Sequence, residues 1–397
     1  MGEFGKMAEW GIVMRLTDDK AIKKRIADSK RIVVKIGSSS LVHGNGAMNF
    51  RAVELLVRQL AELQNFGKQV ILVSSGAVAA GMGKLKMKTK PAEIGKRQAL
   101  AAVGQGILMQ FYEKFFNEYG VDVAQVLLTK EDISHRERYL SVGNTFDALF
   151  EYNIVPIVNE NDTTSFAELK VGDNDTLAAL TACLVEADLL ILLSDIDGLY
   201  TANPRTDENA RRLDVVEEIT EEIEAMAGSA GSSVGTGGMM TKIAAAKIVG
   251  DCGIPMVLTN GSTPEVLFKI FEGDSVGTVF LPKDKSMIKK KGWLAYGADS
   301  SGKIIVDKGA VNALVKKGSS LLPSGVKAVE GRFDRGDIVA VVSENDLHTE
   351  IAKGFVNYSS AEINIIKGHQ SSEIKELLGD HELDDEIIHR DYMSVKI

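Results

Sequence analysis

Residues 154–184 have the sequence IVPIVNENDTTSFAELKVGDNDTLAALTACL, in which two apolar segments enclose a strongly polar loop. The first segment, Ile154–Val158, is predicted to be a buried strand. The last, Thr176–Leu184, is predicted to be a helix because its apolar residues recur at helical spacing. The loop between them is rich in carboxylates and amides, which are costly to bury without partners. Such a loop either faces a ligand or is a solvated turn with an Asp helix cap, and by itself it is compatible with both.

Short apolar strands alternate with longer amphipathic helices from Arg31 to about Gly277. Strands are predicted at Ile32–Ile36, Val70–Val73, Val123–Leu128, Ile154–Val158, Leu189–Leu193 and Met256–Thr259. Helices are predicted at Phe50–Phe66, Lys96–Tyr119, Arg138–Tyr152, Thr176–Glu186 and Met240–Asp251. This alternation predicts an α/β fold with a mostly parallel central sheet sandwiched between helices. In such sheets, ligands bind beyond the carboxyl ends of the strands.

The pattern changes after Gly277. A Lys-rich segment, Leu281–Lys291, is followed by short strand-like pieces at Ile304–Val306, Ser319–Leu322, Val326–Glu330 and Asp337–Val342. These pieces and their Gly-containing turns predict a small β-rich domain. The expected organisation is an N-terminal extension (1–29, with a possible cloning remnant), a first domain (30–282), a linker (283–292) and a β-rich domain (293–397).

The composition narrows the class of protein. The chain of 397 residues carries a net charge of −9, which argues against non-specific nucleic-acid binding. Its apolar runs fall short of the roughly 20 residues of a membrane span, so we expect no membrane association and a cytoplasmic location. The two cysteines, Cys183 and Cys252, lack metal-ligand spacing. We predict that they are buried, inert thiols in a reducing compartment.

Two glycine-rich turns each adjoin a lysine. In VVKIGSSSLV (Val33–Val42), Lys35 precedes a Gly-Ser turn whose N–H groups can bind an anion, although such a lysine is more often a surface residue. In VGTGGMMTKIAAAK (Val234–Lys247), a Gly-Thr-Gly-Gly run opens a helix with Lys242 near its start. A lysine there opposes the helix dipole, and a bound polyphosphate would remove that conflict. The second motif is therefore the most phosphate-specific feature of the chain.

Two other predicted strands end in polar turns. VILVSSGAVAAGMG (Val70–Gly83) places Ser75 and Gly76 before a helix start that would favour a carboxylate or phosphate. The alternative is tight helix–strand packing that requires small residues. In LLILLSDIDGLYTANPR (Leu189–Arg205), a buried strand leads into Ser194 and Asp195, which would either contact a nucleotide or form an ordinary Asp-containing turn. Both alternatives stay open for each turn.

The lysines and the acidic loop together indicate phosphoryl transfer. That reaction needs cations at the developing charge, backbone donors around the phosphates, and carboxylates that orient the lysines or hold Mg²⁺. The six histidines, at positions 43, 135, 348, 369, 381 and 389, all lie outside these motifs. A carboxylate acceptor would need no general base, because its pKa of about 4.3 leaves it ionised at neutral pH.

These motifs resemble those of the amino acid kinase family over roughly Lys30–Gly277. The resemblance is carried by NEND (Asn159–Asp162), KVGDND (Lys170–Asp175), GTGGMMTK (Gly235–Lys242) and RERYLSVGNTFDALF (Arg136–Phe150). The remainder resembles a PUA domain. Ser38, Ser74 and Ser194 stand where the family often has threonine, which preserves the hydroxyl group.

The resemblance implies a role for each matching residue. Lys35 and Lys242 would stabilise the transferring phosphoryl group, and Asp175 would orient both lysines. The acceptor would be bound by Ser75, Asp162 and Asn174, with Gly76 and Asp173 nearby. The nucleotide would be bound by Lys35, Ser194, Asp195, Thr236, Gly237, Gly238, Met239, Met240, Thr241 and Lys242.

The resemblance also implies a reaction. ATP would phosphorylate the side-chain carboxylate of L-glutamate, giving L-glutamyl 5-phosphate in the first step of proline synthesis. Mg²⁺ would be bound mainly to the ATP phosphates rather than to a protein metal site. Similar enzymes are inhibited by proline, form homo-oligomers (dimers or tetramers) and are thought to hand their labile product to glutamyl-phosphate reductase.

Three alternatives compete with this interpretation. Other family members phosphorylate N-acetylglutamate, aspartate or UMP, but NEND, KVGDND and a PUA-like domain together favour glutamate. An RNA-binding protein would need a basic face, whereas residues 283–397 hold 17 Lys and Arg against 18 Asp and Glu. A catalytically inactive amino acid sensor is disfavoured because both lysines and Asp175 are present.

Overall fold

The computed structural model describes residues 19–43, 47–164, 174–204, 207–229, 238–282, 300–379 and 384–395. Its main sheet has eight strands in the order β3-β4-β2-β1-β5-β9-β10-β8. These strands are β1 (Arg31–Ile36), β2 (Gln69–Ser74), β3 (Val123–Leu128), β4 (Val155–Glu160), β5 (Leu189–Ser194), β8 (Val215–Val216), β9 (Met256–Asn260) and β10 (Gly277–Phe280). The pairs from β3 to β9 are parallel, and β10 runs antiparallel to β9. A separate short ribbon pairs β6 (Leu199–Tyr200) with β7 (Arg212–Leu213).

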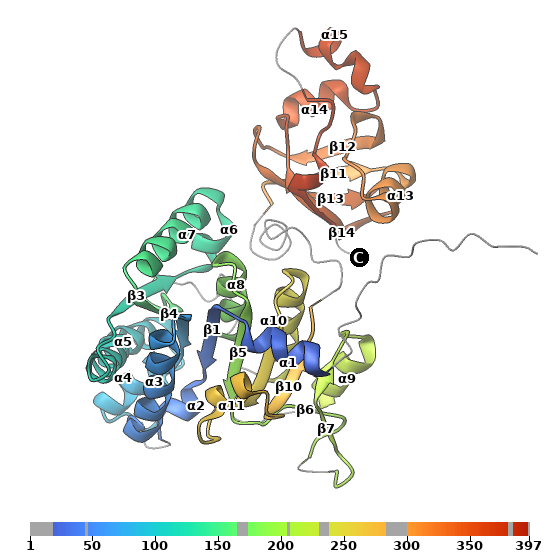
Figure 1. Ribbon diagram of the computed structural model, residues 1–397. Helices are drawn as coiled ribbons and strands as arrows, with labels where there is room; N and C mark the ends of the chain where they lie inside the picture. Colours follow the sequence, from blue (N-terminus) through green and yellow to red (C-terminus); the bar gives the residue numbers. More distant parts are fainter. Residues whose placement is uncertain are drawn as a thin grey trace, which may run out of the picture.

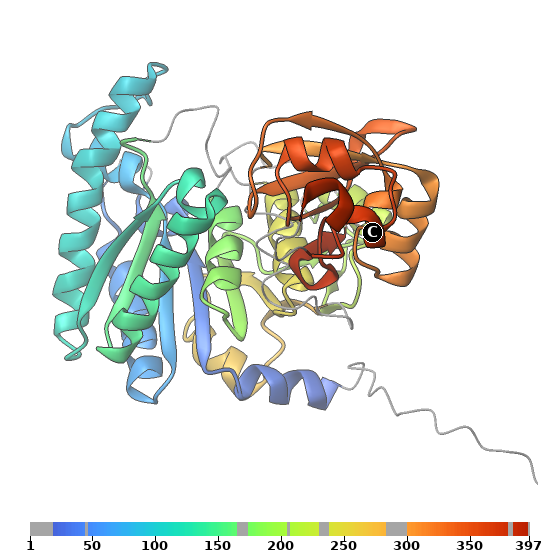
Figure 2. The same cartoon turned by 90° about the horizontal axis from the view of Figure 1, so that it is seen from above.

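Helices cover both faces of this sheet (Figures 1 and 2). They are α1 (Asp19–Ala27), α2 (Ser38–Leu41), α3 (Phe50–Asn65), α4 (Ala77–Lys84), α5 (Ile94–Asn117), α6 (Lys130–Ser134), α7 (Arg136–Glu151), α8 (Asn174–Leu184), α9 (Glu221–Ser229), α10 (Met239–Asp251) and α11 (Val266–Glu272). Alternate residues of β1 point into different cores: Val33 packs in the cluster that contains α8 and α10, and Val34 in the cluster that contains α3 and α5. Burial on both faces explains why β5 is apolar up to Ser194 and why β1 is apolar apart from Arg31 and Lys35.

The predicted α/β fold is confirmed, and the predicted elements of the first domain are present. Each of the six strands and five helices lies within two residues of its predicted ends. The helix start predicted after Gly76 is present as α4. The sequence pattern missed the antiparallel strand β10, the short strands β6, β7 and β8, and the helices α1, α2, α6, α9 and α11. Within the described residues, every helix is too short or too polar to cross a bilayer.

The C-terminal residues form a five-stranded sheet in the order β12-β11-β13-β14-β15 (orange to red in Figure 1). Its strands are β11 (Gly302–Val306), β12 (Val326–Gly331), β13 (Ile338–Ser343), β14 (Asp346–Phe355) and β15 (Met393–Val395). Its helices are α13 (Lys308–Lys317), α14 (Ser360–Ile366) and α15 (Ile374–Leu378). The prediction of a strand at Ser319–Leu322 is wrong, since Leu321 makes only an isolated bridge to Ile388. A single bridge does not make a strand. Leu321 is apolar because it is buried in the core of this domain.

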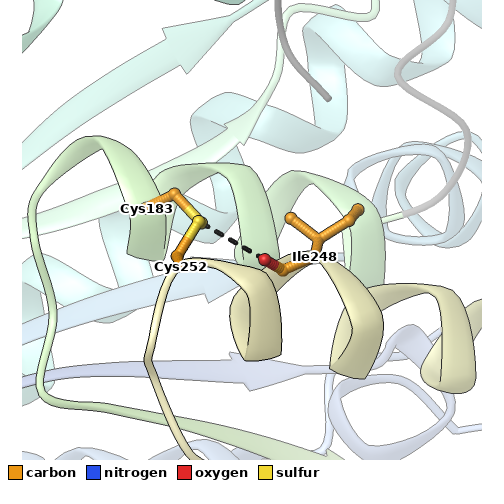
Figure 3. The surroundings of a disulfide bond; sticks show 3 residues. All are labelled: Cys183, Ile248 and Cys252. Carbon is orange, nitrogen blue, oxygen red and sulfur yellow. Dashed lines mark hydrogen bonds between the residues drawn. A yellow bond between two sulfur atoms is a disulfide. The ribbon is translucent and has the colours of Figure 1, made fainter. Parts of the chain in front are cut away.

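The prediction of two free thiols is also wrong, because Cys183 and Cys252 form a disulfide (Figure 3). Cys183 lies at the end of α8 and Cys252 directly follows α10, with their Cα atoms 6.0 Å apart. The cysteines are 69 residues apart in the sequence, and no spacing motif links them. Their pairing depends on how α8 and α10 pack, which the sequence pattern does not reveal.

Candidate functional site

The polar motifs converge at the carboxyl ends of the parallel strands. Lys35 lies one residue before the end of β1, in register with Val73 of β2 and Leu192 of β5. Ser75 directly follows β2, and Ser194 ends β5. Neighbouring parallel strands end at the same edge of a sheet, which is where such folds bind ligands. The strand order therefore gathers segments that are far apart in the sequence into one site.

Asp175 lies between the two lysines singled out by the glycine-rich motifs. Its Oδ1 atom is 2.5 Å from Lys35 Nζ, and its Oδ2 atom is 3.1 Å from Lys242 Nζ. Thr241 also donates a hydrogen bond to Oδ2, at 2.9 Å. Asp175 is fully buried, and the two lysines are only 8% and 5% exposed. Two ammonium groups are thus held side by side at the start of α8 and α10.

Burial acts to raise the pKa of Asp175, but the charges and hydrogen bonds of Lys35 and Lys242 hold this pKa below its ordinary value. The carboxylate therefore stays ionised at neutral pH. An ionised carboxylate can hold both lysine side chains in fixed positions, which satisfies the requirement that buried charges be paired.

A second cluster surrounds Asn174, the first residue of α8. Its side-chain Nδ2 lies 2.7 Å from Ser75 Oγ, 3.0 Å from the Ser74 carbonyl oxygen and 3.1 Å from Asn159 Oδ1, so three acceptors share its two N–H groups. This orients the amide oxygen of Asn174 and the hydroxyl of Ser75 next to the Asp175 cluster. The two halves of the polar loop identified in the sequence, NEND and the end of KVGDND, therefore meet at β2.

Three residues that support this cluster had no predicted role in the site. Asn159 is buried, and its Nδ2 donates a hydrogen bond to Gln105 Oε1 of α5 at 2.9 Å. Tyr112, also on α5, shares a hydrogen bond with Ser74 Oγ at 2.8 Å. Burial raises the pKa of Tyr112, and its hydrogen bond with Ser74 opposes that rise only in part. Asn159 belongs to the NEND motif and was detectable, whereas Gln105 and Tyr112 lie in a helix whose pattern indicates only packing.

Gly76 allows the turn after β2 to form. Its φ of +101° is a left-handed conformation that residues with a side chain rarely adopt, and it precedes the first residue of α4. Helix α4 in turn packs closely on α5, because a Cβ atom at Gly104 would lie 1.7 Å from the Ala77 carbonyl oxygen. Small residues are therefore required here for packing, and the Ser75 turn is held against α5 as a result.

Several of the residues predicted to bind the nucleotide lie at the carboxyl end of β5 and at the start of α10. Ser194 Oγ donates to Asp195 Oδ1 at 3.1 Å, and Asn260 of β9 donates to the Asp195 carbonyl oxygen at 3.4 Å. Gly238 caps α10, and its carbonyl oxygen accepts from the Thr241 hydroxyl at 2.7 Å. The following residues, Met239 and Met240, begin the helix, with Met240 exposed.

Of the remaining predicted site residues, only Asp162 belongs to the part of the chain that the structure describes. Asp162 follows β4 by two residues and is half-buried, and its backbone N–H donates to the Glu160 carbonyl oxygen at 2.9 Å. Asp173, Thr236 and Gly237 lie outside the described residues, as does Lys170. Their predicted roles remain predictions.

The chain resembles characterised proteins over nearly its whole length. Residues 30–260 match the model of the amino acid kinase family, and residues 302–378 match the PUA domain. A protein named glutamate 5-kinase from Carboxydothermus hydrogenoformans (strain ATCC BAA-161 / DSM 6008 / Z-2901) is 55% identical, with the match covering 93% of this chain and 98% of that protein.

Two further relatives carry the same name. The protein from Thermoanaerobacter sp. (strain X514) is 53% identical, with 92% of this chain and 97% of the relative covered. The protein from Geobacter sulfurreducens (strain ATCC 51573 / DSM 12127 / PCA) is 50% identical, again with 92% and 97% covered. By the match of residues 30–260 and by these relatives, the chain belongs to the amino acid kinase family and carries a C-terminal PUA domain.

Proposed function

We propose that this protein transfers the γ-phosphoryl group of ATP to the side-chain carboxylate of L-glutamate, forming L-glutamyl 5-phosphate. The observation that carries the proposal is the buried arrangement of Lys35, Asp175 and Lys242 next to Asn174 and Ser75. Relatives about 50% identical over most of the chain bear the name glutamate 5-kinase, which supports the same acceptor.

In this proposal the protein acts through position and charge. The ammonium groups of Lys35 and Lys242 neutralise negative charge that develops on the transferring phosphoryl oxygens. Asp175 fixes both lysines, and the N–H groups at the start of α10 face the phosphates. No residue needs to remove a proton from the acceptor, because a glutamate side chain with a pKa of about 4.3 is already ionised at neutral pH.

We propose that Mg²⁺ enters with ATP, as part of the substrate. Both oxygens of Asp175 are engaged by lysine ammonium groups, so this carboxylate does not fit the role of a metal ligand. Bound to ATP, the ion would supply charge neutralisation at the phosphates.

The acceptor is proposed to bind on the Asn174 side of the site. There Asn174 and Ser75 offer hydrogen-bonding groups, and the acidic residues Asp162 and Asp173 would attract the ammonium group of glutamate. A site for two anionic substrates would not be expected to carry so many carboxylates. The attraction of the substrate's ammonium group accounts for them.

A coupled assay of ADP formation tests the proposed function. The protein is incubated with MgATP and, in separate reactions, glutamate, aspartate, N-acetylglutamate or UMP. We expect turnover with glutamate and no significant turnover with the others. Aspartate is one methylene shorter, N-acetylglutamate lacks the ammonium group, and UMP offers a phosphate in place of the carboxylate. Turnover that depends on UMP or N-acetylglutamate would instead assign the chain to another branch of the family.

Family resemblance extends the proposal to regulation and assembly. We propose that proline inhibits the enzyme, that the chain forms a dimer or tetramer in the cytoplasm, and that glutamyl-phosphate reductase receives the product. An acyl phosphate hydrolyses readily, so direct hand-over would protect it. Adding proline to the glutamate assay tests the first of these proposals.

Replacing Asp162 with alanine is expected to raise the KM for glutamate by about 10- to 100-fold, because a charged hydrogen bond to the substrate is lost. The KM for ATP should stay within about twofold, since the nucleotide is proposed to bind at β5 and α10. Initial rates measured over a range of glutamate concentrations and a range of ATP concentrations give the two KM values separately.

Thr164→Ala provides the matched control for Asp162, because Thr164 is an exposed residue of the same turn. We expect both KM values of this variant to remain near those of the unchanged protein. A defect in Asp162→Ala that is selective for ATP would show that the acceptor pocket has been misplaced.

A further inference from the structure

Helices α8 and α10 are joined at both ends. At their N-terminal ends, Lys242 and Thr241 of α10 contact Asp175 of α8. At their C-terminal ends, the disulfide links Cys183 of α8 to Cys252, which directly follows α10 (Figure 3). The same two helices therefore carry the buried ion pair of the site and the only disulfide of a chain that contains two cysteines.

The two connections are far enough apart to restrain the helices as rigid bodies. Eight residues separate Asp175 from Cys183, or about 12 Å along α8 at 1.5 Å per residue. Ten residues separate Lys242 from Cys252, or about 15 Å along and just beyond α10. Two rods linked at one end can still pivot about that end, whereas links at both ends oppose pivoting and sliding.

Both helices carry short buried side chains among larger ones such as Leu177 and Ile243. Buried residues of α8 include Ala178, Ala179 and Ala182, and those of α10 include Ala245 and Ala246. Alanine packs closely but interlocks less than a large side chain, so it opposes sliding less strongly. A covalent link at the far end therefore adds a restraint to the one that this packing provides.

We propose that the Cys183–Cys252 disulfide is a positioning element for the phosphoryl-transfer site, and that its reduction lowers turnover. This inference rests on the proposed function. Cys183 and Cys252 touch neither substrate nor phosphate in this view. They act through α8 and α10, by holding Asp175 at the distance from Lys242 and Thr241 that orients the lysine.

The fold can accommodate the two thiols that form when the disulfide is reduced. A dithiol reductant adds two electrons and two protons to the pair, breaks the sulfur–sulfur bond, and is itself converted to a cyclic disulfide. The Cys183 sulfur lies 3.8 Å from the Ile248 carbonyl oxygen, so the thiol formed by reduction has an acceptor within reach. We therefore expect reduction to loosen the pair of helices without unfolding the protein.

The test compares oxidised and reduced full-length protein. Alkylation followed by mass spectrometry first establishes the state of the two cysteines. Glutamate-dependent ADP formation is then measured before and after treatment with dithiothreitol, well below the unfolding temperature. We expect kcat to fall about tenfold on reduction, since small displacements of catalytic groups have effects of this size or larger. Both KM values should change by less than about twofold, and reoxidation should restore kcat.

The double variant Cys183→Ala, Cys252→Ala provides the matched control. It should show the lower kcat without treatment and should not respond to dithiothreitol, because the chain has no other cysteine. If reduction lowers only the unfolding temperature and leaves kcat unchanged, the disulfide is a purely structural link and the proposal is overturned. Free thiols in the isolated, untreated protein would overturn it as well.

The same measurements separate this inference from the proposed function. Untreated protein that forms no ADP with glutamate contradicts the proposed function itself. Untreated protein that is active, with a kcat that does not depend on the redox state, contradicts only the positioning role of the disulfide.

Discussion

Replacing Lys242 with alanine is expected to lower kcat for glutamate-dependent ADP formation by about 1,000-fold, because a buried cation next to the transferring phosphoryl group is lost. The variant should remain folded, since Asp175 keeps its contacts with Lys35 and Thr241. Steady-state rates give the loss of activity, and circular dichroism with thermal unfolding checks the fold.

Lys247→Ala is the matched control on the same helix. Lys247 is partly exposed and pairs with Glu224 at 2.5 Å, away from the Asp175 cluster. Its replacement should leave kcat within about twofold, because a surface ion pair contributes little. A kcat for Lys242→Ala within about threefold of the unchanged protein would place the phosphates elsewhere. If Lys242→Ala fails to fold, Lys242→Met restores most of the volume without the charge.

Replacing Asp175 with asparagine is expected to reduce both activity and stability. The change keeps the shape of the side chain but leaves Lys35 and Lys242 buried without their shared carboxylate. Removing one partner of a buried ion pair typically costs about 3–5 kcal/mol. We also expect kcat to fall by about 1,000-fold, because the lysines lose the group that orients them. Urea unfolding and initial rates measure the two effects independently.

The same variant should alter how stability depends on pH. The folded-state pKa of Asp175 is lower than its ordinary value of 3.8. Its contribution to stability is therefore present above the unfolded pKa and is lost as the pH falls through the folded pKa. Asp175→Asn removes this contribution, so the gap in stability between the two proteins should narrow as the solution is acidified below about pH 4.

Asp147→Asn is the control for this series. The Asp147 side chain is 67% exposed, and it lies 3.9 Å from Arg31. Its loss should cost less than about 1 kcal/mol, as is usual for surface ion pairs. An Asp175→Asn protein as stable and active as this control would contradict the proposed role of the buried cluster.

The architecture of the first domain followed from hydrophobic pattern because its strands are buried on both faces. Strand β5 is apolar up to Ser194, and β1 is apolar apart from Arg31 and Lys35, which distinguishes both strands from the amphipathic helices between them. The C-terminal domain was harder to predict. Its longest strand, β14, has mostly exposed residues in its first half and was missed, whereas the apolar segment around Leu321 was mistaken for a strand.

The site was predictable only in part. Glycine-rich turns beside Lys35 and Lys242 pointed to phosphate, and family resemblance suggested that Asp175 orients both lysines. Nothing in the pattern of α5 distinguished Gln105 or Tyr112 from packing residues, yet their side chains reach Asn159 and Ser74. Such contacts depend on the side-chain directions of two elements at once, which one-dimensional periodicity does not contain.

The sequence by itself determined the alternating strands and helices, and hence the edge of the sheet at which polar turns gather. It did so because burial on a sheet or helix face imposes a period that is visible along the chain. Only the tertiary structure decided that Cys183 bonds to Cys252 and placed Lys242 against Asp175, 67 residues away in the sequence. Both outcomes depend on the packing of α8 against α10, and the distance between two helices is set by three-dimensional packing rather than by the spacing of residues within either one.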